Sequence, residues 1–262
     1  MYFNETQKSY YLRIGFNLLI SFFSALFAHF SLYKSSFSSL KSDLQNKAVV
    51  LAGCGAMDGS EIHESTLLLY AIQKAGAKYE IFAPNREQRD VMNIIEGSPM
   101  NEKRNVMVES ARIARGKIRD LMELRASDFD ALIIPGGFGA AKNLFTFAYD
   151  GLNFNVEKDI EAVVLNFNES KKPIGAMCIA PMMLASVLGS KHVEVTLGPK
   201  SELCCDVEDK FGAIVSVTGT SGVVVDEKNK VATTPAYMYG DNTILEVGRG
   251  AQNLVDAVLK MI

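Results

Sequence analysis

Three short runs in this chain are apolar throughout and lack the alternation of polar and apolar residues that a half-exposed strand shows. They are Lys47–Gly53, Asp130–Pro135 and Lys172–Met177. Strands of this kind are buried on both faces, which is typical of a parallel sheet covered by helices on both sides. Segments with the apolar spacing of helices, such as Glu64–Ala75 and Val156–Ser170, lie between them. This alternation predicts an α/β fold: a single doubly wound, mostly parallel sheet with helices on both faces.

The remaining elements fit the same architecture without internal repeats or linkers. We predict strands at Lys78–Ala83 and Val193–Thr196, a hairpin at Val223–Thr233, a charged helical stretch over residues 101–125 and a final helix at Asp241–Lys260. The mixed signs of charge in 101–125 favour a solvated helix face with intrahelical ion pairs over an anion-binding site. One domain is therefore expected from residue 46 to residue 262.

Residues 1–45 differ from the rest of the chain and are interpreted as a targeting or membrane-anchor segment. Between Ile14 and Tyr33 there is no charged residue apart from His29, and a Ser-rich stretch without acidic residues follows until Asp43. Few basic residues argue against a mitochondrial presequence, whereas the Ser-rich, acid-poor composition supports one. We predict a mitochondrial location. The alternatives are a membrane anchor or a secretory signal through residues 14–33, the only part expected to contact a membrane, or a start codon assigned too far upstream.

Composition excludes several classes of protein. The chain has 262 residues and a formal net charge of −3, which provides no basic surface for nucleic acid. Its four cysteines and three histidines show no zinc-site spacing, so no metal is expected, and a reducing compartment fits better than a disulfide framework. The pair Gly53-x-Gly55 resembles the start of a dinucleotide-binding fingerprint, but the third glycine position is occupied by Asp58. No cofactor is predicted.

Cys178 stands where the apolar strand ending at Met177 meets a helix that has Pro181 in its first turn. A cysteine on such a turn lies beside the free N–H groups of a helix N-terminus, which favour the thiolate. This is the arrangement of a nucleophile elbow. The competing interpretation is a buried structural cysteine, the more frequent role of this residue type.

The carboxyl ends of two other predicted strands carry groups that a nucleophilic thiol needs. In an open α/β sheet these ends lie at one edge, where ligands bind. The first strand leads to Glu61 and Glu64, either of which provides a carboxylate, and the strand ending at Pro135 leads to Gly137. The backbone N–H groups of Gly137 and Ile179 are candidate oxyanion donors.

Two further residues near the first strand are secondary candidates. His63 precedes Glu64 and lies on another helix face, so it is interpreted as a rim or packing residue. Cys54 is either a second thiol or a small packing residue.

With these strand ends assembled, the chain resembles the PfpI/ThiJ-like superfamily and, within it, the ElbB glyoxalase-like branch, which includes mitochondrial relatives in eukaryotes. The resembling segments cover nearly everything from residue 46 onward; they are 50–55, 58–64, 104–116, 135–144, 173–181 and 234–238. The resemblance implies a flavodoxin-like fold of the class I glutamine amidotransferase type. It also implies that Cys178 is the nucleophile, that Glu64 rather than Glu61 contacts its sulfur, and that Gly137 and Ile179 form the oxyanion site.

The chain departs from this superfamily at histidine. Many members carry a histidine at the end of the strand after the elbow, where this chain has Thr196–Pro199, and the peptidases have one directly after the cysteine, where this chain has Ile179. No histidine follows His192, although glutaminase triads need a late one. A glutaminase or peptidase is therefore not expected.

The leading hypothesis is a cofactor-independent glyoxalase that converts glyoxal or methylglyoxal to glycolate or lactate. Cys178 adds to the aldehyde as a hemithioacetal, and Glu64 moves the proton between the two carbons. With Glu64 as the only acid/base, turnover is expected to be slow. The alternative is a non-enzymatic, redox-responsive or protective thiol protein that uses the same cysteine. The family has also been associated with an accessory role in isoprenoid metabolism. The sequence leaves the physiological substrate and the formation of a homo-oligomer open.

Overall fold

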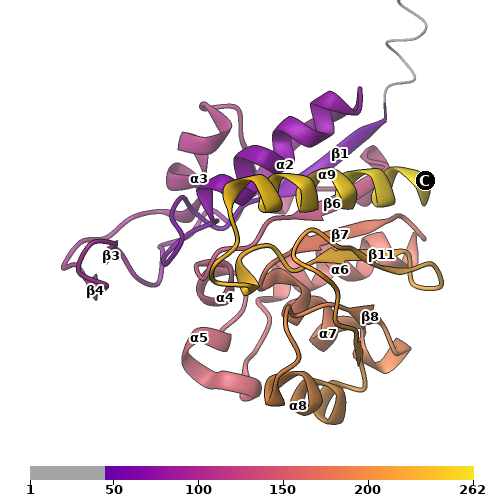
Figure 1. Ribbon diagram of the computed structural model, residues 1–262. Coiled ribbons are helices and arrows are strands. Elements are labelled where there is room, and N and C mark those ends of the chain that lie inside the picture. Colours follow the sequence, from indigo (N-terminus) through magenta and orange to yellow (C-terminus); the bar gives the residue numbers. More distant parts are fainter. Residues whose placement is uncertain (1–44) are drawn as a thin grey trace, which may run out of the picture. The chain divides into compact units, whose positions relative to one another are not determined.

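The computed structural model describes residues 45–262, and Gln45–Ile262 form one compact unit built on a seven-stranded sheet (Figure 1). The strand order is β10-β11-β7-β6-β1-β2-β5, and every neighbouring pair is parallel except β10 with β11. The strands are β1 Asn46–Val50, β2 Lys78–Ala83, β5 Arg119–Asp120, β6 Ala131–Ile134, β7 Ile174–Met177, β10 Val224–Asp226 and β11 Val231–Thr234. The predicted doubly wound, mostly parallel sheet is thus confirmed.

Helices cover both faces of the sheet. Helices α2 (Ile62–Lys74) and α9 (Ile244–Lys260) lie side by side on one face, and α6 (Lys158–Glu169) and α7 (Ala180–Leu188) pack on the other (Figure 1). The other α-helices are α3 Val106–Ala114, α4 Ala140–Asn143, α5 Phe147–Asp150 and α8 Glu202–Phe211. Short 3₁₀ turns occupy Leu121–Glu123, Ala126–Asp128, Gly151–Asn153, Gly189–Lys191 and Ala236–Met238.

The central strands form the middle of the core. Every residue of β6 and β7 is buried, as are residues 47–50 of β1. The register aligns Val49 of β1 with Ile133 of β6, and Ile134 with Ala176 of β7. The carboxyl ends of these three strands therefore meet at one edge of the sheet, as the apolar runs predicted.

Two predicted elements differ in the structure. In the charged stretch 101–125 the α-helix is limited to α3, because Arg115 and Gly116 both adopt left-handed conformations and turn the chain after Ala114. The ion pair Arg112–Glu109 is intrahelical as predicted. The strand expected at Val193–Thr196 is reduced to β8 (Glu194–Val195), which pairs with β9 (Ile214–Val215) outside the main sheet.

Helix boundaries shift by a few residues where side-chain caps decide them. The last helix begins at Ile244 rather than Asp241, because Thr243 and Glu246 form a reciprocal capping box. The first helix begins at Ile62, with Glu61 as its N-cap.

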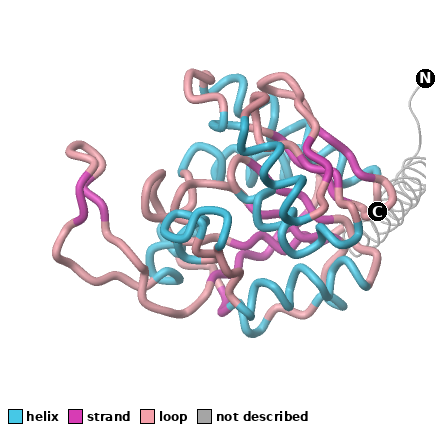
Figure 2. The backbone as a smooth tube through the Cα atoms, turned by 90° about the horizontal axis from the view of Figure 1, so that it is seen from below, coloured by secondary structure: helices cyan, strands magenta, loops and turns pink. Residues whose placement is uncertain are grey.

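A second small sheet is the hairpin of β3 (Met92–Asn93) and β4 (Ser98–Pro99), which projects from the body of the molecule in both views (Figures 1 and 2). No helix within residues 45–262 is long and apolar enough to cross a membrane. The predictions for the N-terminal segment, including residues 14–33, concern residues 1–44 and lie outside the described residues.

Candidate active site

Cys178 occupies a strained turn between β7 and α7. Its φ of 58° is left-handed, a conformation that costs a non-glycine residue free energy and persists only where the surroundings impose it. Its N–H donates to the carbonyl of Thr234 (3.0 Å), which holds the turn against the end of β11. Only 8 % of the residue is exposed. The predicted sharp turn between a strand and a helix is therefore present at Cys178.

Glu64 reaches this thiol from the first turn of α2. Its carboxylate is fully buried and shares a hydrogen bond with the side chain of Cys178. Oε2 accepts from the N–H of Gly136 (2.9 Å), and Oε1 accepts a longer bond from the N–H of Tyr237 (3.4 Å). Three segments far apart in the sequence thus hold one carboxylate in place against the sulfur.

The glycines after β6 permit this close approach. A Cβ on Gly136 would lie 2.4 Å from the Cβ of Cys178 and 2.7 Å from Oε2 of Glu64. Gly137 has a φ of 100°, and a Cβ there would lie 2.3 Å from the backbone nitrogen of Glu61. Any side chain at either position would push the thiol, the carboxylate and the loop before α2 apart.

The protonation of this pair differs from the sequence-based expectation of a stabilised thiolate. Burial raises the pKa of Glu64 to about 7. The hydrogen bond from Cys178 lowers this pKa, whereas the charge of the Glu61 carboxylate raises it. Burial also raises the pKa of the Cys178 thiol well above its ordinary value, and the charge on Glu64 raises it further. The helix N-terminus acts in the predicted direction but is outweighed by desolvation. At neutral pH the thiol therefore keeps its proton.

Two backbone donors lie beside the sulfur. The N–H groups of Gly137 and Ile179 both form hydrogen bonds with Cys178, which lower the pKa of its thiol against the larger effects of burial and charge. An oxygen bound to a carbon attached to this sulfur would lie within reach of the same donors. The structure thus places both predicted oxyanion donors beside the thiol.

Glu61 has a different role from Glu64. Its side chain caps α2 by accepting from the N–H of Glu64 (2.7 Å), and its own N–H donates to the carbonyl of Gly136 (3.0 Å). It therefore positions the turn that carries Glu64 and acts on that carboxyl only through its charge.

Cys54 does not join the pair. It is half-buried, and the charged groups that act on it are Glu109, Arg112 and Asp58 rather than those of the Cys178 site. Burial raises the pKa of its thiol. No interaction links it to Cys178, so the structure favours the packing interpretation.

His63 lies at the rim of the site and pairs with a residue that sequence reasoning did not select. Its Nδ1 lies 2.9 Å from the hydroxyl of Tyr237, and the two rings tilt at 50° with centroids 6.1 Å apart. The backbone of Tyr237 also contacts Glu64. The motif Thr234–Met238 was noted in the sequence only for its resemblance, and its distance along the chain gave no sign that it packs beside α2.

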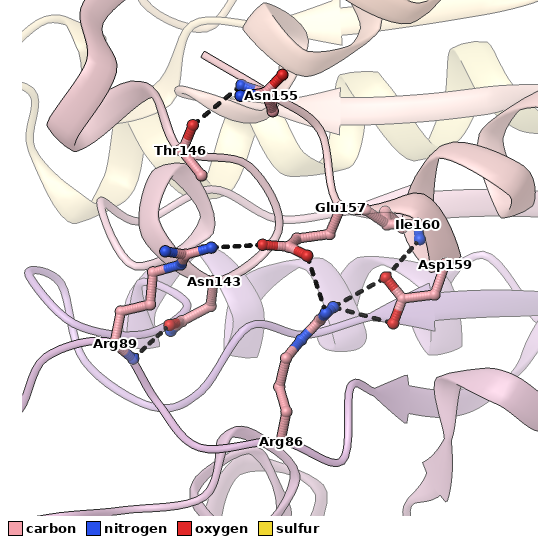
Figure 3. A network of polar contacts seen from close by, with 8 residues as sticks. All are labelled: Arg86, Arg89, Asn143, Thr146, Asn155, Glu157, Asp159 and Ile160. Atoms are coloured by element: carbon pink, nitrogen blue, oxygen red, sulfur yellow. Dashed lines mark hydrogen bonds and ion pairs between the residues drawn. The ribbon is translucent and has the colours of Figure 1, made fainter.

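Polar contacts fix the loops around the site from outside (Figure 3). Asn143 of α4 donates through Nδ2 to the carbonyls of Ala52 and Asp58, and its Oδ1 accepts from the N–H of Arg89. The Arg89 guanidinium pairs with Glu157, which also pairs with Arg86 (3.2 Å). Nη2 of Arg86 in turn donates to both carboxylate oxygens of Asp159 at 2.9 Å. The loop that leads from β1 to the site is therefore tied to α4 and α6.

Neither described histidine contacts the thiol. His63 pairs with the hydroxyl of Tyr237, and His192 bonds the carbonyl of Gly212 (2.9 Å). Within residues 45–262 no three His, Cys, Asp or Glu side chains group closely enough to hold a metal ion. The groups available for chemistry at the described site are thus the thiol, one carboxyl and the backbone donors.

Comparison with known proteins identifies what this arrangement resembles. Residues 47–242 match the DJ-1/PfpI family. The chain is 45 % identical over 223 residues to the rat "ES1 protein homolog, mitochondrial", covering 82 % of this chain and 83 % of the relative. It is 48 % identical over 200 residues to the human "Glutamine amidotransferase-like class 1 domain-containing protein 3, mitochondrial", covering 73 % and 74 %. The names of these relatives bear out the predicted mitochondrial location.

A solved structure supports the fold and the branch. The "isoprenoid biosynthesis protein with amidotransferase-like domain" from Ehrlichia chaffeensis is 37 % identical and superposes with a TM-score of 0.76. The match covers 83 % of this chain and all of that one. The resemblance to the ElbB-like branch and to the class I glutamine amidotransferase-like fold is therefore confirmed.

Proposed function

This chain belongs to the DJ-1/PfpI family, and we propose that it is a cofactor-independent glyoxalase acting on glyoxal or methylglyoxal through Cys178 and Glu64. The observation that carries the proposal is the buried contact between this thiol and this carboxyl. A carboxyl with a pKa near 7 is matched to accepting and returning a proton at neutral pH. The low exposure of Cys178 selects for a small electrophile over a peptide or a protein.

In the first step, Sγ of Cys178 bonds to the aldehyde carbon while the thiol proton passes through Glu64 to the carbonyl oxygen. The product is a hemithioacetal, whose oxygen is held by the N–H groups of Gly137 and Ile179. Charge that develops on this oxygen during attack is stabilised by these donors without reorganisation of solvent.

In the second step, Glu64 removes the hydrogen of the carbon bound to sulfur, which gives an enediol. It then returns a proton to the neighbouring carbon, so that one carbon is oxidised and the other reduced within the same molecule. The result is a thioester of glycolate or lactate on Cys178. Water cleaves this thioester and restores the thiol, and no external oxidant or cofactor is consumed.

Tyr237 and His63 are the nearest candidates to replace the missing histidine of the wider superfamily. Their hydrogen bond leads from the surface toward the backbone contact with Glu64. We assign them a positioning role at the mouth of the site. A His63→Gln variant keeps a hydrogen-bond partner for the Tyr237 hydroxyl but cannot exchange a proton. A changed pH profile of turnover in this variant would therefore indicate proton exchange through His63, whereas an unchanged profile would indicate packing alone.

The geometry gives less support to the redox-responsive alternative. Redox-sensing cysteines are exposed and have a low pKa, whereas Cys178 is buried and its pKa is raised. The absence of a histidine beside this thiol among the described residues also argues against hydrolysis of glutamine. The isoprenoid function in the name of the Ehrlichia protein has no counterpart in the described side chains.

The test is a time course of purified full-length protein with glyoxal, following glycolate by nuclear magnetic resonance. We expect glycolate to form in the wild type and not in Cys178→Ala, with both proteins showing the same circular dichroism. Glycolate formation by Cys178→Ala would disprove the mechanism. Stoichiometric oxidation of Cys178 by mild peroxide, without any glycolate from the wild type, would favour the redox alternative instead.

A further inference from the structure

Strand β2 has an open stretch along the edge of the main sheet. Strand β5 pairs with Phe82 and Ala83 at the end of β2 and with no earlier residue. Residues 78–81 of β2 therefore have a strand partner in β1 but none on the opposite side among the described residues. An open strand edge exposes main-chain donors and acceptors with which another extended chain can pair.

The main-chain N–H groups on this open side belong to Tyr79 and Ile81. In a parallel ladder, every second residue of a strand directs its N–H and C=O groups to the same neighbour. The N–H of Lys78 donates on the β1 side, to the carbonyl of Gln45 (2.9 Å). Every second residue from Lys78 onward therefore faces β1, and the N–H groups of Tyr79 and Ile81 face away from it.

Left-handed turns after helix α3 create this opening. If β5 continued backwards in the same register, residues 115–118 would lie opposite residues 78–81. Arg115 and Gly116 instead have φ values of 53° and 79°, which an extended strand does not allow. The chain therefore leaves the edge of the sheet after α3 and joins it only at Arg119.

A cavity of about 730 Å³ lies beside the open stretch. Tyr79 and Ile81 line it from β2, and Ala114 and residues 115–119 line it from the chain that follows α3. Its apolar part is continuous with the core, because Tyr79 and Ile118 pack against buried core residues. The cavity therefore lies where a strand partner is missing and has room for an apolar side chain.

The lining of the cavity carries an excess of positive charge. Arg119 pairs with Glu80 (2.9 Å) and with Glu123 (3.1 Å). Arg115 and Lys117 line the same cavity, but their exposed side chains form no hydrogen bond or ion pair with any described residue. Two cations without counter-ions favour a partner that carries carboxylates.

We propose that this edge of β2 binds an extended, acidic segment of a partner protein as an added strand. The main chain of the segment pairs with Tyr79 and Ile81, and one of its apolar side chains enters the cavity. Its carboxylates pair with Arg115 and Lys117. The open stretch is the amino-terminal part of β2, whereas Cys178 lies at the carboxyl ends of the strands, so this binding is independent of the proposed reaction.

Charge favours such a partner over two segments of the chain itself. A second copy paired through the same edge would bring Arg115 and Lys117 of both copies together, and like charges oppose this pairing. Residues 34–42, which precede the described part of the chain, include Lys34 and Lys41 and no acidic residue. They therefore lack the complementary charge as well.

The test is fluorescence anisotropy of a labelled hexapeptide of alternating valine and glutamate, titrated with the full-length protein. We expect saturable binding, and a dissociation constant at least about tenfold higher for the same peptide with lysine in place of glutamate. The double variant Arg115→Glu/Lys117→Glu should reverse this preference. Lys158→Glu/Lys228→Glu is the matched control, because these two exposed lysines do not line the cavity. It should leave both dissociation constants within about twofold, since screened distant charges contribute little.

A proline substitution at Tyr79 tests the main-chain pairing. Tyr79→Pro removes an N–H on the open side and leaves the pairing of Lys78 and Glu80 with β1 in place, which an edge strand tolerates. Tyr79→Thr removes the ring but keeps the N–H. We expect Tyr79→Pro to bind the glutamate peptide about threefold or more weakly than Tyr79→Thr, the effect of one hydrogen bond. Circular dichroism of both variants should match that of the wild type.

The proposal is rejected if the wild type does not bind the glutamate peptide, if it binds both peptides equally, or if the control variant loses binding as well. Full displacement of the peptide by citrate at constant ionic strength, with no effect of Tyr79→Pro, would assign the cavity to small anions and also reject the added strand. Glycolate formation from glyoxal should be unchanged in Arg115→Glu/Lys117→Glu, so the outcome for the edge of β2 is separate from the outcome for the proposed function.

Discussion

Two carboxyl groups of this protein, Glu64 and Asp90, show how differently the chain treats charge at its site and around it. Glu64 is fully buried with no cation beside it, and burial raises its pKa to about 7. Burial alone would also raise the pKa of Asp90, but hydrogen bonds from Lys142 (2.6 Å) and Tyr149 (2.8 Å) lower it below its usual value. The carboxyl of Glu64 titrates near neutral pH, whereas the carboxylate of Asp90 stays charged in an ion pair.

The difference shows that the groups proposed for the chemistry and the ion pairs that hold the surrounding loops lie in separate parts of the molecule. The loops after β1, β6 and β7 approach each other through glycines and a strained cysteine, which costs free energy. The carboxylates of Asp90, Glu157 and Asp159 lie outside this site and form ion pairs with Lys142 and Arg86. Substitutions in the two regions should therefore separate activity from stability.

The largest expected effect is on catalysis in Glu64→Gln. The amide keeps an oxygen for the N–H of Gly136 but can no longer carry a proton to or from the substrate. We expect the rate of glycolate formation to fall by about 10²- to 10⁴-fold, the usual contribution of a general acid/base. The thermal midpoint should stay equal or rise, because a buried carboxyl is replaced by a neutral group. Unchanged turnover would remove Glu64 from the mechanism.

Gly136→Ala should have the next largest effect, on both activity and stability. The added methyl group cannot coexist with Cys178 and Glu64 at their present separation. Overpacking of this kind costs about 1–3 kcal/mol of unfolding free energy, measurable by urea denaturation. Gly240→Ala is the matched control, since no atom lies within 4 Å of a Cβ there. Similar losses in both variants would contradict the close approach seen at Gly136.

The pH dependence of stability should reflect the raised pKa of Glu64. The folded protein holds this proton up to about pH 7, whereas the pKa of a glutamate in the unfolded chain lies near its ordinary value of 4.5. Stability from this group is therefore present at low pH and is lost as pH rises through this interval. The thermal midpoint of Glu64→Gln relative to wild type should increase from pH 5 to pH 8. A difference that stays constant with pH would show that the carboxyl does not titrate there.

The alkylation rate of Cys178 should follow the raised pKa of its thiol. Iodoacetamide should react slowly at pH 7 and faster as the solution becomes more alkaline, with Cys178→Ala as the background for the other cysteines. Rapid, pH-independent alkylation from pH 6 upward would instead support the stabilised thiolate that the helix N-terminus led us to expect.

The smallest effect is expected in the surrounding network. Arg86→Ala removes a half-exposed guanidinium that bridges Glu157 and Asp159 (Figure 3). Partly exposed pairs contribute about 1 kcal/mol or less, so the unfolding free energy should fall slightly and the rate of the proposed glyoxalase reaction should change less than twofold. A large loss of turnover with intact stability would show that the network acts on the chemistry.

Much of the fold and part of the candidate site could be predicted because both follow from local pattern. Wholly apolar runs between helical segments indicated a covered parallel sheet, since no other arrangement buries both faces of such strands. A cysteine at a strand-to-helix junction beside Pro181 indicated an elbow. Helix α3 was predicted too long, because the left-handed turn at Arg115 has no clear signal in a residue type that rarely adopts it.

The sequence alone thus determined the sheet, the edge where its strand ends meet and the position of Cys178 on that edge, because periodicity and chain order specify which residues share a face. Only the tertiary structure decided the proton state of Cys178 and Glu64, since desolvation depends on every segment packed around the pair. It also brought Tyr237 to His63 across 174 residues of chain. The position of the thiol follows from the local sequence, whereas its surroundings come from segments that are distant in the sequence.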